Sequence, residues 1–135
     1  MATLDLKRIP ATLSDGTAYD ISYWHIESGN PGPCVLVTAA IHGNEVNGTE
    51  AIRRFMPYAK EHLAKGSCLL VPFANPQAVS GCRPHIDFEF GKSHARDQAN
   101  NANCTWPGNA EGSSGQRLIG ACPRISAGKL RGRGT

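Results

Sequence analysis

Residues 34–55 read CVLVTAAIHGNEVNGTEAIRRF, in which an apolar run is followed by a polar turn and then by a helical pattern. The apolar run from Cys34 to Ala40 is typical of a central strand that is buried on both faces. A helix is expected from about Thr49 to Leu63, and Pro57 predicts a kink or a split within it, because proline lacks an N–H group. The expected apolar stripe of this helix consists of Ala51, Ile52, Phe55, Met56 and Ala59.

The segments on either side of this stretch extend the pattern. Residues 68–73 (CLLVPF) predict a second buried strand, so that the order strand, helix, strand favours a parallel βαβ unit. Upstream, residues 3–9 and 18–26 alternate apolar and polar positions around a turn, which predicts a hairpin. A further helix can begin near residues 116–121. The sequence therefore predicts an α/β fold.

The composition excludes several classes of protein. The chain has 135 residues, which suits one small domain, and its 40% hydrophobic content is too high for general disorder. No apolar run approaches the roughly 18 residues needed to cross a membrane, and the N-terminus lacks the apolar core of a secretory signal. The five cysteines form no CxxC pair, which favours reduced thiols over a structural zinc knuckle. We therefore expect a cytoplasmic protein without a membrane partner.

The net charge of +3 is unevenly distributed. The last fourteen residues contain four basic residues and no acid, which leaves −1 for residues 1–121 when these four are subtracted. We therefore divide the chain into residues 1–121, the folded part, and residues 122–135, a basic, Gly-rich tail that is expected to be disordered. A basic tail alone does not indicate a nucleic-acid surface, so no nucleic-acid partner is expected. The alternative is a non-catalytic module that uses this tail to bind an anion or a nucleic acid.

The chemistry of the chain is expected in the turn His42-Gly43-Asn44-Glu45, directly after the apolar run. An HxxE spacing on a turn that leads into a helix can bring an imidazole and a carboxylate to one point. Such a pair suits zinc, which needs a third protein ligand and an open position for water. Gly43 permits a tight turn, and Gly48 lets the following helix pack closely. On spacing alone, the same residues also fit a polar turn that caps a helix.

Three ordered motifs resemble the succinylglutamate desuccinylase/aspartoacylase family, zinc hydrolases related to the carboxypeptidase A group. The string TAAIHGNEVNGTEAIRRF resembles the first metal motif, HGNExxG. LLVPFANPQAV resembles the next strand and its Asn-Pro-x-Ala turn, and Arg83 lies where the family often has an arginine. Residues 101–108 (NANCTWPG) resemble the motif Asp-x-Asn-Arg-x-aromatic-Pro-Gly. The resemblance covers about residues 33–120 and implies a zinc-carboxypeptidase-like mixed sheet with flanking helices.

The resemblance also implies a reaction. His42 and Glu45 would hold a zinc cofactor, Arg83 would stabilise the oxyanion, and Asn103 would bind the substrate. Zinc would activate a water molecule, and a glutamate would pass its proton to the leaving amine. The implied substrate is a small molecule, an N-acyl amino acid or a related carboxylate whose amide bond is hydrolysed.

The chain also departs from the family pattern. Asn101 and Cys104 replace the aspartate and arginine of the third motif, and Arg96 or Arg117 are candidates to compensate. The family's third zinc ligand, a histidine, and its base, a glutamate, lie further downstream, whereas CPRISAGKLRGRGT does not resemble family sequence. The expectation is thus that residues 1–121 are the N-terminal part of a zinc hydrolase catalytic domain, truncated and inactive or barely active. The loop residues His85 and His94 are alternative ligands. A non-functional truncation product with an exposed sheet edge is a third interpretation.

Overall fold

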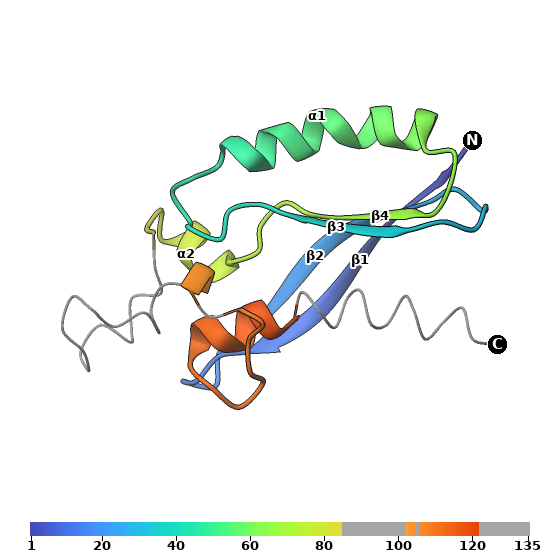
Figure 1. Cartoon of the computed structure of the whole chain (residues 1–135). Coiled ribbons are helices and arrows are strands. Elements are labelled where there is room, and N and C mark those ends of the chain that lie inside the picture. Colours follow the sequence, from blue (N-terminus) through green and yellow to red (C-terminus); the bar gives the residue numbers. More distant parts are fainter. Residues whose placement is uncertain (85–101, 105, 122–135) are drawn as a thin grey trace.

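The computed structural model describes residues 1–84, 102–104 and 106–121. They form a four-stranded mixed sheet in the order β1-β2-β4-β3, with helices on both faces (Figure 1). The strands are β1 (Thr3–Thr12), β2 (Ala18–Glu27), β3 (Cys34–Thr38) and β4 (Ser67–Val71). The helices are α1 (Asn47–His62), α2 (Pro76–Ser80), the 3₁₀ helix η3 (Ala102–Cys104) and a helical segment over residues 114–121. The predicted α/β class and the mixed sheet with flanking helices are confirmed.

The predicted hairpin is formed by β1 and β2, which pair antiparallel along their whole length. The turn between them is closed by Asp15, whose carboxylate accepts bonds from the backbone N–H and the hydroxyl of Thr17 at 2.9 and 2.8 Å. These bonds favour the ionised carboxylate and lower its pKa. Gly16 follows at φ 87°, a conformation that glycine adopts without steric cost.

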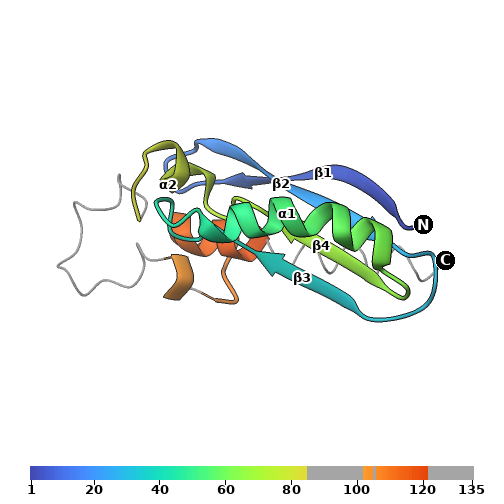
Figure 2. The ribbon, with the colours of Figure 1, turned by 90° about the horizontal axis from the view of Figure 1, so that it is seen from above.

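The predicted βαβ unit is also confirmed, because β3 and β4 are parallel and α1 forms the crossover between them. Figure 2 shows α1 lying over the sheet. The predicted split of this helix is wrong, since α1 continues through Pro57. Pro57 is exposed, so water can reach the carbonyl group that the proline leaves without a helical partner.

The apolar stripe of α1 was predicted only in part. Ile52 and Ala59 are buried, and Met56 packs against them, but Ala51 and Phe55 are exposed. Helical periodicity explains the difference: 52, 56 and 59 repeat at intervals of four and three residues, whereas 51 and 55 lie one position away on the neighbouring face.

The expectation that the run beginning at Cys34 forms a central strand buried on both faces is wrong for the sheet that the structure describes. β3 is an edge strand there, and Val35 is 50% exposed. β4 takes the central place instead, and all five of its residues are buried. Apolar composition does not distinguish the two positions, because both strands are rich in Val, Leu and Cys.

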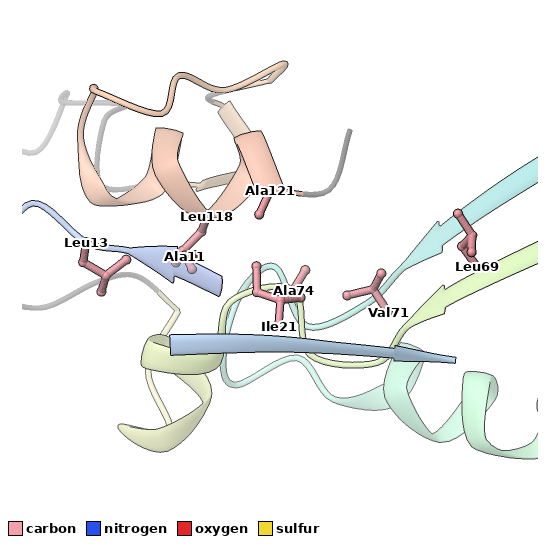
Figure 3. Packing of buried hydrophobic residues seen from close by; sticks show 8 residues of the cluster. All are labelled: Ala11, Leu13, Ile21, Leu69, Val71, Ala74, Leu118 and Ala121. Carbon is pink, nitrogen blue, oxygen red and sulfur yellow. The ribbon is translucent and has the colours of Figure 1, made fainter. Parts of the chain in front are cut away.

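Two apolar clusters, one on each face of the sheet, hold these elements together. Side chains alternate along β4, so that Leu69 and Val71 join one cluster while Cys68 and Leu70 join the other. The first cluster lies under the helical segment 114–121, whose Leu118 and Ala121 point toward the strands (Figure 3). The second lies under α1 and consists of Ala2, Ile26, Ala39, Ile52, Ala59, Cys68 and Leu70.

Burial also determines the character of Cys68, which is 6% exposed. Desolvation raises the pKa of its thiol, so the group stays protonated and behaves as a small apolar side chain.

Among the described residues, no helix combines the length and the apolar content that crossing a membrane requires.

Candidate metal centre

The candidate site lies beyond the carboxyl ends of β3 and β4, which reach the same edge of the sheet because the strands are parallel. The two segments stay hydrogen-bonded after the strands end: Ala39 N–H donates to Val71 O at 2.9 Å, and Ala74 N–H donates to Ala39 O at 2.8 Å. Open α/β sheets bind ligands at such edges. The chain thus places the turn after β3 and the turn after β4 side by side.

His42 and Glu45 converge in the turn after β3. Nδ1 of His42 lies 3.0 Å from Oε2 of Glu45, and the backbone N–H of Glu45 donates to His42 O at 3.1 Å. The His42 side chain is 21% exposed and that of Glu45 is 71% exposed. A contact this exposed contributes little to stability, so the two side chains are of interest mainly because they bring two donor atoms together.

The capping alternative for this turn is wrong. The N-cap residue of α1 is Val46, and no side chain makes a capping hydrogen bond there. The carboxylate of Glu45 contacts His42 instead. Gly48 serves α1 in the way that the sequence predicted: a Cβ atom at this position would lie 3.0 Å from the Cβ of Ala39, so the helix packs closely on the end of β3.

The donor pair fits zinc in type and in spacing. Two donors bound at about 2.1 Å to a tetrahedral ion lie roughly 3.4 Å apart, close to the 3.0 Å that separates Nδ1 of His42 from Oε2 of Glu45. No group of three His, Cys, Asp or Glu side chains that could hold a metal occurs within the described ranges. His42 and Glu45 are therefore two candidate ligands, and the described part of the chain provides no third beside them.

The same two side chains line a cavity of about 250 Å³. Asn103, which belongs to η3, lines it as well, so the first and third sequence motifs meet in space. The remaining lining comes from the end of β3 and the turn that follows it, namely Thr38, Ala39, Ala40 and Ile41. His42, Glu45 and Asn103 thus line a common space that is large enough for part of a small ligand.

The two arginines among the described candidates lie elsewhere. Arg83 is exposed, follows α2, and donates its backbone N–H to Ala78 O at 3.0 Å; it does not line the cavity. Arg117 donates from Nε to Gly112 O at 2.7 Å and lines a separate cavity of about 260 Å³ near Pro10. Arg117 is thus not placed to replace the missing arginine of the third motif. Several other candidates lie outside the described residues: His85, His94, Arg96, Asn101 and the tail 122–135.

Asn75 belongs to the Asn-Pro-x-Ala motif of the sequence, but its structural role was not predicted. It is fully buried, and its side chain caps α2 by accepting the backbone N–H of Ala78 at 3.2 Å. An asparagine directly before a proline that occupies the first position of a helix is a recognisable N-cap pattern, and it could have identified this role.

Known proteins resemble this chain in both sequence and structure. A model of the succinylglutamate desuccinylase/aspartoacylase catalytic domain matches residues 31–123. Human N-acyl-aromatic-L-amino acid amidohydrolase (carboxylate-forming) is 38% identical over 60 residues, which are 44% of this chain and 18% of that protein.

The structural similarity extends further along the chain. An aspartoacylase family protein from Mesorhizobium loti has a TM-score of 0.76 at 25% identity, over 93% of this chain and 37% of its own. The product-bound ectoine utilization protein EutE from Ruegeria pomeroyi has a TM-score of 0.64 at 21% identity, over 88% of this chain and 34% of its own. The chain spans less than half the length of each of these relatives. Since the domain model matches well over half of its residues, the chain belongs to the succinylglutamate desuccinylase/aspartoacylase family.

Proposed function

We propose that this chain supplies part of the zinc site of a hydrolase that cleaves the amide bond of an N-acyl amino acid or a similar small carboxylate. The observation that carries the proposal is the convergence of His42 Nδ1 and Glu45 Oε2, 3.0 Å apart, in a cavity that Asn103 also lines. Membership of a deacylase family and the similarity to a human amidohydrolase support the reaction class.

In this proposal His42 and Glu45 hold the metal through the two atoms that already face each other. When bound, zinc supplies a Lewis acid that polarises an amide carbonyl and activates water. Asn103, which lines the same cavity, offers the substrate both a hydrogen-bond donor and an acceptor. Its amide is neutral and lacks the fixed fork of an arginine, so it orients a carboxylate less strongly.

Arg83 is proposed to stabilise the oxyanion that develops on the carbonyl oxygen. This role requires its exposed side chain to reorient, because Arg83 does not line the cavity. The described residues contain no group of three possible ligands. We further propose that the rest of this chain supplies neither the third zinc ligand nor the general base. With only two protein ligands, zinc binding should be weak and hydrolysis slow.

Hydrolysis by the purified chain tests this function. With zinc added, we expect slow release of free amino acid from N-acetyl and N-succinyl amino acids, below about 1 per second, against a median near 10 per second for enzymes. Mass spectrometry of long incubations should detect the product, and a chelator should stop its formation. A control variant is His62→Ala, which removes an exposed histidine of α1 that the proposed site does not use. This change should leave the rate of hydrolysis unchanged.

Two results would contradict the proposal in different ways. No product above that formed by zinc in buffer would exclude hydrolysis by this chain. Turnover near 10 per second or faster would show that this chain already contains a complete catalytic site.

A further inference from the structure

We propose that Asn75 is a positioning residue that holds the His42 turn against the start of α2. Asn75 follows β4, whereas His42 follows β3, so the two meet only because the parallel strands end at the same edge. The effect of Asn75 on metal binding rests on the proposed zinc site. Its positioning of the turn does not, and it can be tested in the metal-free protein.

Asn75 contacts both turns through three hydrogen bonds. Its backbone N–H donates to Ala40 O at 3.2 Å, and its side-chain Nδ2 donates to Ile41 O at 3.2 Å. Its Oδ1 accepts the backbone N–H of Ala78 at 3.2 Å. The two carbonyls that it binds are consecutive and directly precede His42. One buried side chain therefore fixes the backbone before the imidazole to the first turn of α2.

The turn needs such support because its backbone is unfavourable in isolation. Ala40 has φ 54°, in the left-handed region that residues with a Cβ atom avoid. A conformation of this kind persists only where surrounding contacts determine it. The bonds from Asn75 to the carbonyls of Ala40 and Ile41 are contacts of that kind.

Close packing of Gly43 against α2 also holds the turn in place. A Cβ atom at Gly43 would lie 2.1 Å from the carbonyl carbon of Ala78 and 2.4 Å from the nitrogen of Val79. The turn thus lies against the backbone of α2 with no space for a side chain. Asn75 binds the carbonyl group of Ile41, directly before His42, and Gly43, directly after His42, packs against α2. The residues on both sides of His42 are therefore held by α2 and its N-cap.

The variant Asn75→Ser separates the two roles of the side chain. Serine is a good N-cap, so its hydroxyl should still accept the N–H of Ala78, but it has no atom at the position of Nδ2. We expect hydrogen exchange of the backbone amides in residues 41–46 to accelerate roughly 5-fold or more in the metal-free chain, with α2 less affected. We also expect the Kd for zinc to rise roughly 10-fold, as happens when the partner that orients a metal ligand is lost.

The matched control is Asn30→Ser. Nδ2 of Asn30 donates to Ala64 O at 2.9 Å, also across 34 residues, but in a turn far from the site. This variant should change neither the exchange of residues 41–46 nor the affinity for zinc. A change of the same size in both variants would contradict a specific role for Asn75.

The outcomes separate this inference from the proposed function. If the wild-type chain binds no zinc, the proposed function fails, while hydrogen exchange in the metal-free chain still decides the role of Asn75. If zinc binds and Asn75→Ser leaves both the exchange of residues 41–46 and the affinity unchanged, only the positioning role fails. Should the variant not fold, NMR of the wild-type chain decides. Slow hydrogen exchange of the Asn75 side-chain amide protons supports the positioning role, and fast exchange overturns it.

Discussion

Replacing His42 with alanine should weaken zinc binding by this chain more than about 100-fold. Loss of a residue that merely orients a ligand costs 10- to 100-fold in affinity, and His42 is proposed to be one of only two ligands. Its Nδ1 is the nitrogen that faces Glu45, and alanine offers the metal no donor. Isothermal titration calorimetry with zinc in a non-chelating buffer measures the effect directly.

The control for this experiment is a second histidine that also lies near a carboxylate. Nε2 of His62 lies 3.7 Å from Oε2 of Glu61, but both side chains are exposed at the end of α1, and neither lines the cavity. His62→Ala should therefore leave the affinity for zinc unchanged. If His62→Ala weakens binding as much as His42→Ala does, zinc binds to surface histidines and the proposed site is wrong.

Gly43→Ala should give the second large effect, on both stability and metal binding. Its new methyl group would overlap backbone atoms of Ala78 and Val79, which cannot move aside as a flexible side chain can. Overpacking of this kind costs about 1–3 kcal/mol, so we expect a loss of about 3 kcal/mol in the free energy of unfolding. The turn should also move away from α2, which weakens zinc binding. Urea denaturation and zinc titration measure the two effects.

Gly16→Ala is the control for a glycine replacement that strains the backbone without overlapping other atoms. Gly16 has φ 87°, but a Cβ atom there would meet nothing within 4 Å. Alanine at this position should cost about 1–2 kcal/mol through its left-handed conformation and leave the affinity for zinc intact. If Gly43→Ala proves no more destabilising than Gly16→Ala and keeps full zinc affinity, the close contact between the turn and α2 is wrong.

The elements that the sequence predicted well are those with a local cause. The hairpin follows from alternation on both sides of a Ser-Asp-Gly-Thr turn, and the parallel unit follows from two apolar runs separated by a helical pattern. The expected place of β3 at the centre of the sheet was wrong because its composition does not reveal which strand pairs on each side. Continuity of α1 through Pro57 depends on exposure, which the sequence does not show.

The candidate site was predictable to a similar extent. The distance between His42 and Glu45 follows from a short turn, and sequence spacing captures it. Asn103 was predicted as a site residue only because a whole motif resembles the family. Its place at the same cavity as His42 and Glu45 does not follow from sequence spacing. The bonds from Asn75 to carbonyls 34 and 35 residues upstream could not be foreseen, because they depend on how two strand ends meet.

Zinc K-edge X-ray absorption of the zinc-loaded chain tests the central claim most directly. The exposed thiol of Cys82 is a competing ligand, and sulfur lies about 2.3 Å from zinc, whereas nitrogen and oxygen lie at about 2.0–2.1 Å. A site made by His42 and Glu45 predicts nitrogen and oxygen neighbours only, with an imidazole pattern that disappears in His42→Ala. Sulfur at about 2.3 Å, or an imidazole pattern that persists in this variant, would contradict the assignment.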